Sequence, residues 1–351
     1  HYIFGNPGTS ESPIMDAIES FPDMQYVLVM QEGVAMGIAD AYARATRKPA
    51  FVNLHIETGL ANGISLLNNA AAGGTPLVLS AGNKDIRELA HGRTDLVRMV
   101  EQFTKWSAEA THPEQVPYFV RRAFNEAKTP PTGPTFISFS ANALDDEADM
   151  EIVASPTTYP RVAPDPQAIK RAARVLADSS NPIMIIGDRV ADSQATSEAV
   201  QVAEILGARV YESLTSEMAF PTSHPQFVGA LRLGYGTSYK ILSTADVVLM
   251  VGKLLNGYYM FSKPTLRYMG PETKLVHLDS DQREVGSTQP TDVGIISDPK
   301  TALIELAEAL DDVMSGADRE AAQGRALVVG AETRKAREAW QHQVKQRWDA
   351  S

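Results

Sequence analysis

The chain has 351 residues, of which 44% are hydrophobic and 21% charged, a globular composition long enough for two domains. Its 32 basic and 43 acidic residues give a formal net charge of −11, which argues against nucleic acid as a partner because no basic excess can neutralise phosphates. Cysteine is absent, which excludes disulfides, thiolate metal sites and a cysteine nucleophile.

The chain opens with His1-Tyr2-Ile3-Phe4, inside a predicted strand and without an initiator Met, so we expect it to be part of a longer polypeptide. No apolar run reaches the roughly 18 residues of a membrane span, and no signal peptide opens the chain. We therefore expect a cytoplasmic protein with no membrane partner.

Residues 1–140 alternate strand-length apolar runs with helical patterns. Strands are predicted over Tyr2–Phe4, Gln25–Met30, Ala50–His55, Thr75–Ala81 and Thr135–Phe139. Helices are predicted over Ser12–Ser20, Gly33–Ala45, Leu60–Ala72, Thr94–Glu101 and Pro113–Ala127. In the second helix, the spacing of Val34, Ile38, Ala41 and Ala45 predicts the buried face. This alternation predicts a parallel sheet with helical crossovers.

An acidic run from Asp145 to Glu151 and four prolines between Pro156 and Pro166 predict an exposed linker. A second α/β unit follows, with strands predicted over Pro182–Gly187, Arg209–Glu212, Val247–Gly252, Lys274–Leu278 and Val293–Ile296. Its predicted helices are Gln167–Ala177, Gln194–Leu206 and Pro299–Leu310. The fold class is thus α/β, with two doubly wound parallel-sheet domains at 1–150 and 160–315 and a helical connector at 316–351.

The residues that suggest chemistry follow three predicted strands of the first unit. These segments are Gly5–Thr9, Gln31-Glu32-Gly33 and the stretch from His55 through Thr58-Gly59 to Asn62. In an open α/β sheet, ligands bind outside the carboxyl ends of the strands. Each segment also has a purely structural explanation: a tight turn, an acid at a helix start and a half-buried histidine. The residues alone leave the function open.

The same segments resemble thiamine diphosphate-dependent enzymes, and among these the benzoylformate decarboxylase subgroup most. The resemblance rests on Phe4-Gly-Asn-Pro-Gly-Thr9, Gln31-Glu-Gly33, Val52-Asn-Leu-His55 and Thr58-Gly59, with Arg47-Lys-Pro-Ala-Phe51 and Gly133-Pro-Thr135 in the same order. It identifies the first unit as a pyrimidine-binding domain and the second as the family's Rossmann-like middle domain.

The resemblance implies a thiamine diphosphate-dependent 2-oxo acid decarboxylase that acts through a C2 ylide. Glu32 would activate the cofactor through its aminopyrimidine, with a pKa raised by partial desolvation, and His55 would transfer protons near the substrate. Thr9 would bind the substrate carboxylate, and Tyr259 falls near the position of the subgroup's second catalytic histidine. The implied cofactor-binding residues, besides Glu32, are Gly5, Asn6, Pro7, Gly8, Thr58, Gly59 and Asn62.

The family's segment for Mg²⁺ and diphosphate, in a third domain, has no match in this sequence. We therefore expect Mg²⁺ to bind through a domain not in this chain, and a homodimer or homotetramer whose site is shared between subunits. Glu57, where the subgroup has a small residue, puts benzoylformate itself in doubt as the 2-oxo acid. An acetolactate synthase-like carboligase and a non-catalytic nucleotide-binding fragment remain as alternatives.

Overall fold

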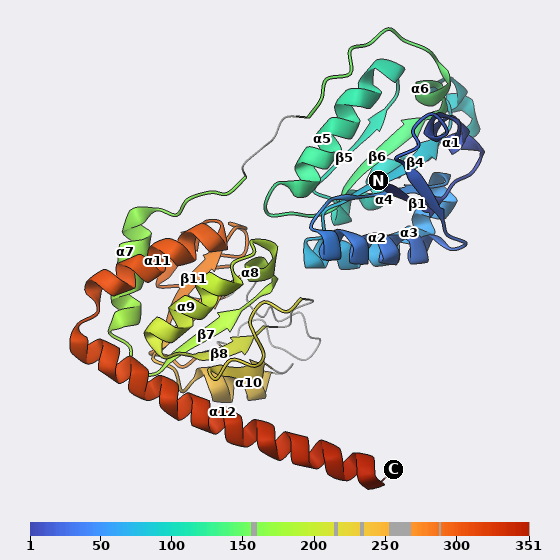
Figure 1. The fold of residues 1–351 in the computed structure, drawn as a ribbon. Coiled ribbons are helices and arrows are strands. Elements are labelled where there is room, and N and C mark those ends of the chain that lie inside the picture. Colours follow the sequence, from blue (N-terminus) through green and yellow to red (C-terminus); the bar gives the residue numbers. More distant parts are fainter. Residues whose placement is uncertain (156–159, 214–216, 232–234, 253–267, 288, 351) are drawn as a thin grey trace. The chain divides into compact units, whose positions relative to one another are not determined.

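The computed structural model describes residues 1–350 apart from 156–159, 214–216, 232–234, 253–267 and 288. It contains two compact units, residues 1–160 and 161–351. Each unit is built around one six-stranded sheet in which all the paired strands are parallel. Helices cover both faces of each sheet, so the α/β doubly wound prediction is confirmed (Figure 1).

The strand order of the first unit is β2-β1-β3-β4-β6-β5. Its strands are β1 (Tyr2–Asn6), β2 (Gln25–Leu28), β3 (Ala50–Leu54), β4 (Leu77–Asn83), β5 (Trp106–Ala110) and β6 (Thr135–Ser140). Its helices are α1 (Ser12–Ile18), α2 (Glu32–Thr46), α3 (Ile56–Gly73), α4 (Leu96–Val100), α5 (Val116–Lys128) and α6 (Ala141–Asp145), and the short 3₁₀ turn η1 (Thr9–Glu11) precedes α1.

Alternating side chains of these strands build two cores, one on each face of the sheet. In β4, Leu77 and Leu79 pack with α2, α3 and α4, whereas Val78 packs on the opposite face with α5. The same alternation separates Phe136 from Ile137 in β6. The central strands are therefore buried on both faces and mostly apolar, and their buried polar side chains are Asn53, Ser80, Asn83, Thr135, Ser138 and Ser140.

The predicted buried face of α2 is wrong. Val34 is 50% exposed and Ile38 is 40% exposed, whereas Ala35, Met36, Ala39 and Ala43 are buried. Both faces of this helix carry apolar residues, and the alanines of the buried face let the helix backbone approach the sheet and α3 closely. The face with Val34 and Ile38 is left on the surface.

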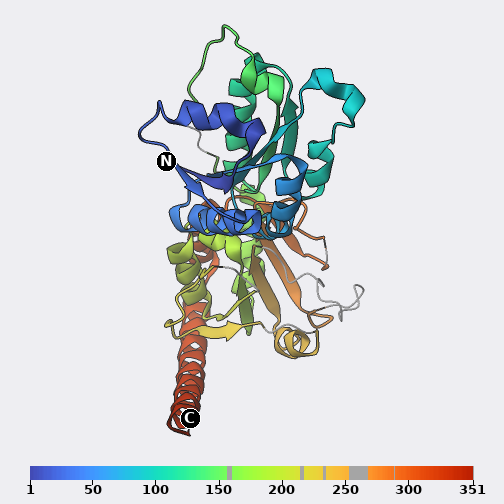
Figure 2. The same cartoon turned by 90° about the vertical axis from the view of Figure 1, so that its right-hand side faces the viewer.

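The second unit has the strand order β12-β11-β10-β7-β8-β9. Its strands are β7 (Pro182–Ile186), β8 (Arg209–Glu212), β9 (Phe227–Ala230), β10 (Val247–Val251), β11 (Lys274–Asp279) and β12 (Val293–Ile296). Its helices are α7 (Pro166–Ala177), α8 (Asp188–Asp192), α9 (Thr196–Leu206), α10 (Tyr235–Leu242), α11 (Pro299–Val313) and α12 (Gly316–Ala350). The long helix α12 packs on α9 and β9 through its first half (Figure 2). None of the helices in the described residues is long and apolar enough to cross a membrane.

Candidate functional site

The carboxyl ends of β1, β2 and β3 lie at one edge of the first sheet because the three strands are parallel neighbours. Asn6 ends β1, Glu32 begins α2 shortly after β2, and His55 follows β3 directly as the N-cap of α3. The fold thus brings together the three segments that the sequence singled out.

Glu32 is fixed by amide groups from two directions. The Nδ2 of Asn6 donates to its Oε1 at 3.0 Å, and the Nδ2 of Asn62 donates to its Oε2 at 3.1 Å. The side chain of Gln31 caps α2 by accepting from the backbone N–H of Val34 at 2.8 Å, which holds the first turn in place.

The expected pKa of Glu32 is wrong in direction. Partial burial raises the pKa of this carboxyl, but its own backbone N–H, the amides of Asn6 and Asn62 and the nearby His55 lower it, and the net pKa lies below its ordinary value. Hydrogen bonds to the ionised form outweigh desolvation because the carboxylate stands at an open sheet edge.

The ring of His55 is held by Glu11, the last residue of η1. The Nδ1 of His55 lies 2.8 Å from the Oε2 of Glu11, which is fully buried, while the histidine side chain keeps 29% exposure. The sequence analysis missed Glu11. Its place three residues after Gly8, where its Oε2 accepts from the Gly8 backbone N–H at 2.9 Å, matches a capping spacing that could have indicated it.

Two glycines of the predicted site, Gly59 and Gly5, differ in what surrounds them. A Cβ at Gly59 would lie 3.5 Å from the Oε1 of Glu32 and 3.7 Å from the Cβ of His55, so the bare backbone leaves space beside both groups. Gly5 lies within β1, where a Cβ would meet the carbonyl oxygen of Asn53 at 2.0 Å; glycine is needed there for strand packing.

Of the remaining predicted site residues, three lie in the segments that follow β1 and β3, and one is not described by the structure. Thr9 and Thr58 are exposed, in η1 and in the first turn of α3, and Pro7 is half-buried between β1 and η1. Tyr259 lies outside the described residues, so its predicted contact with substrate is not addressed. Within the described parts of the chain, no three His, Asp or Glu side chains are grouped so that they could hold a metal ion.

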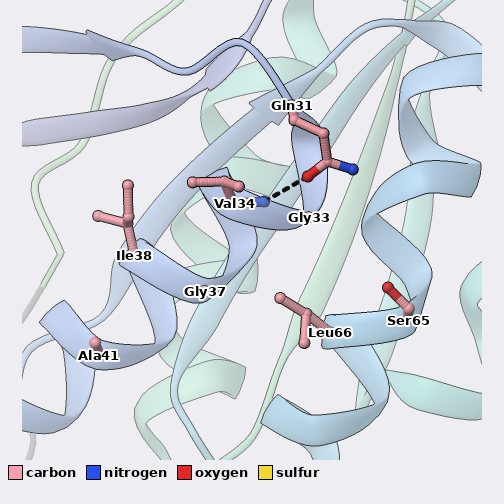
Figure 3. Close-up of a pocket in the computed structure, with 8 residues that line it drawn as sticks. All are labelled: Gln31, Gly33, Val34, Gly37, Ile38, Ala41, Ser65 and Leu66. Carbon is pink, nitrogen blue, oxygen red and sulfur yellow. Dashed lines mark hydrogen bonds between the residues drawn. The ribbon is translucent and has the colours of Figure 1, made fainter.

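A shallow apolar groove adjoins the site between α2 and α3. Val34, Ile38 and Ala41 of α2 line one side, and Leu66 of α3 lines the other (Figure 3). Gly37 forms the floor between the helices, where a Cβ would come within 3.4 Å of the Cδ1 of Leu66. The groove begins at Gln31 and Gly33, next to Glu32.

Two family models match the chain, one in each unit. The N-terminal TPP-binding domain of thiamine pyrophosphate enzymes (another name for thiamine diphosphate) matches residues 1–103, and the central domain of these enzymes matches residues 169–306.

Two named proteins are similar in sequence to most of this chain. A benzoylformate decarboxylase of Pseudomonas aeruginosa is 31% identical over 314 residues, which cover 86% of this chain and 58% of that protein. A protein of Methanocaldococcus jannaschii named "Probable acetolactate synthase large subunit" is 28% identical over 318 residues, which cover 88% of this chain and 53% of that protein. The chain thus spans little more than half the length of these relatives.

A solved structure supports the same relationship. The crystal structure of benzoylformate decarboxylase from Polynucleobacter necessarius matches with a TM-score of 0.80 and 31% identity, covering 88% of this chain and 58% of that chain. This match covers most of both units. The chain belongs to the thiamine pyrophosphate enzyme family and carries its N-terminal and central domains.

Proposed function

We propose that the protein carrying this chain is a thiamine diphosphate-dependent 2-oxo acid decarboxylase of the benzoylformate decarboxylase type. The observation that carries the proposal is the placement of Glu32 and His55 side by side at an open edge of the first sheet, with Gly59 between them. The 31% identity to a benzoylformate decarboxylase supports it.

The residues at this edge fit the aminopyrimidine end of thiamine diphosphate. Asn6 and Asn62 each donate one hydrogen bond to Glu32, and a carboxylate has about four acceptor positions, so its oxygens still have places for a proton shared with a ring nitrogen. Gly59 places no side chain beside Glu32. The turn at Gly8, with Asn6, would hold the cofactor from the β1 side. When bound, the cofactor supplies the nucleophilic carbon and the electron sink for carbon–carbon bond cleavage.

Two titratable side chains, Glu32 and His55, would then give and take protons. The chain alone keeps Glu32 ionised at neutral pH, because its pKa lies below the ordinary value. With the cofactor bound, Glu32 would share a proton with a ring nitrogen of the aminopyrimidine, and because both groups are otherwise acceptors, that proton would have to enter the site together with the cofactor. His55, with one ring nitrogen on Glu11, has its other nitrogen, Nε2, available to give or take a proton near the substrate.

The substrate and the metal follow from the same proposal. Thr9, exposed at the mouth of this edge, would bind the carboxylate of a small 2-oxo acid. Glu57, in the first turn of α3, adds negative charge there and disfavours an aromatic 2-oxo acid such as benzoylformate. Mg²⁺ and the diphosphate would bind to a further domain of the protein.

A carboligase of the acetolactate synthase type is the second candidate, because the 28% identity to a relative of that name is close to that of the decarboxylase. Product analysis separates the two. With pyruvate, a carboligase forms a coupled five-carbon acid, whereas a decarboxylase releases the aldehyde.

The test is Glu32→Gln in the full-length protein, assayed with thiamine diphosphate, Mg²⁺ and a panel of 2-oxo acids. We expect turnover to fall about 10²–10⁴-fold, the usual contribution of a proton-transfer group, with an unchanged melting temperature. Glu19→Gln, at the exposed end of α1, is the matched control and should retain full turnover. Equal turnover in the two variants would rule out the proposed role of Glu32.

A further inference from the structure

Glu11 is a buried carboxylate with three hydrogen-bond partners from three separate segments. Its Oε2 accepts from the backbone N–H of Gly8 at 2.9 Å and contacts the Nδ1 of His55 at 2.8 Å. Its Oε1 accepts from the backbone N–H of Gly82, near the end of β4, at 2.7 Å. Burying a carboxylate without partners is costly, so these contacts explain how an acid is tolerated at a position with no exposed surface.

The backbone around this carboxylate is shaped to hold the histidine ring. A Cβ on Gly8 would lie 2.3 Å from the Nδ1 of His55, and a Cβ on Gly82 would lie 2.3 Å from the Oε1 of Glu11. Glycine is therefore needed at both positions, once to seat the ring and once to let the carboxylate reach β4. Both close approaches involve the Glu11–His55 pair, and neither involves Glu32.

Backbone strain is found at the same corner. Ile56, the residue after His55, has a φ of +36°. A β-branched side chain disfavours positive φ strongly, and such strain persists only where the surrounding structure enforces it. The turn from β3 into α3 is thus held in a costly conformation at the point where it presents His55.

We propose that Glu11 is the positioning residue of His55. An ionised carboxylate can only accept, so the Nδ1 of the ring must carry the hydrogen, and the Nε2 is left as the proton acceptor. Two acidic side chains lie near the ring, Glu11 from η1 and Glu32 from α2. The assignment of Nε2 as the proton-transferring atom rests on the proposed function. The tautomer with the hydrogen on Nδ1 rests only on the contact between His55 and Glu11 in this chain.

The first test is the tautomer of His55 in the wild-type chain without cofactor. Long-range ¹H–¹⁵N NMR of ¹⁵N-histidine-labelled protein distinguishes the two neutral forms, and the signal lost in His55→Gln assigns the resonance. We expect the neutral ring to carry its hydrogen on Nδ1. A neutral ring that carries it on Nε2 would overturn the proposal without any variant of Glu11.

The second test is Glu11→Gln, followed by the same long-range NMR of His55. A glutamine amide can donate as well as accept, so the neutral ring should no longer be held in one tautomer. Glu19→Gln is the control and should leave the tautomer of His55 unchanged. A ring that stays fixed with its hydrogen on Nδ1 in folded Glu11→Gln protein contradicts the proposal; if that variant does not fold, the wild-type tautomer decides. Both readouts are independent of turnover, so a failed Glu32→Gln test would remove the proposed function and leave them standing.

Discussion

His277, in β11 of the second unit, is a buried histidine whose proton binding differs between the folded and the unfolded chain. It is 1% exposed, and its Nε2 lies 3.0 Å from the carbonyl oxygen of Gly252. Burial lowers the pKa of the ring, and the Gly252 carbonyl and the charges of Asp279 and Glu284 offset this only in part. In the unfolded chain the ring returns to a pKa of about 6.5.

The sign of the pH dependence follows from this difference. Below about pH 6.5 the unfolded chain binds a proton that the folded ring resists, so the free energy of unfolding falls as the pH falls from 7.5 to 5.5. The amide of His277→Gln can still donate to Gly252 but does not titrate. In this variant, the fall in the free energy of unfolding between pH 7.5 and 5.5 should be smaller by an amount on the order of 1 kcal/mol. Denaturant midpoints at three pH values measure it, with His342→Gln on the exposed part of α12 as control. If the free energy of unfolding depended on pH in the same way in wild type and in His277→Gln, His277 would not be a source of the pH dependence.

At the site, the sequence located Glu32 and His55 but not Glu11, for a physical reason. Glu32 and His55 follow strands directly, and the ends of parallel strands meet at one edge of the sheet, so local patterns suffice to bring them together. The role of Glu11 depends on the backbone of Gly82, 71 residues away, and on the ring of His55, 44 residues away. No local pattern encodes those contacts.

At the scale of elements, α2 shows where periodicity alone fails. Val34, Ile38, Ala41 and Ala45 have helical spacing, and so do Ala35, Met36, Ala39 and Ala43. Spacing alone does not choose between these two sets, and the sheet and α3 bury the second. The exposed face then becomes one side of the groove beside Glu32 (Figure 3).

Two substitutions on α2 test which face supports the fold. Met36→Ala removes a fully buried side chain from the core and should lower the free energy of unfolding by about 2–5 kcal/mol. Val34→Ala, two residues earlier on the exposed face, should change it by no more than about 0.5 kcal/mol. Chemical denaturation of both variants beside wild type is the measurement. A larger loss in Val34→Ala than in Met36→Ala would contradict the orientation of the helix.

The two strands that the sequence did not predict, β5 and β9, each end the strand order of their sheet. The sequence of β5, Trp-Ser-Ala-Glu-Ala, is only half-buried, and β9 contains a glycine in four residues. Strands buried on both faces carry longer apolar runs and are easier to identify, whereas these two strands lack such a run.

At the scale of the whole molecule, the first unit exposes more apolar surface than its own fold explains. Leu28, in the edge strand β2, is 62% exposed, and Met30, which follows it, is 87% exposed. Val34 and Ile38, both in α2, are 50% and 40% exposed. Large apolar side chains exposed on a compact unit are typical of contact surfaces. We therefore propose that this patch, Leu28, Met30, Val34 and Ile38, contacts a second copy of the protein, as expected for a homodimer or homotetramer.

A matched pair of isoleucines tests this contact. Ile38 in α2 and Ile304 in α11 are both 40% exposed, so a lysine at either position can keep its aliphatic stem on the surface and its charge in water. Sedimentation velocity over a range of concentrations should show association of the wild-type chain and of Ile304→Lys. Ile38→Lys should shift toward the monomer, because a charge buried in an apolar contact opposes association. A wild-type chain that stays monomeric throughout, or variants that associate equally, would contradict the proposed contact.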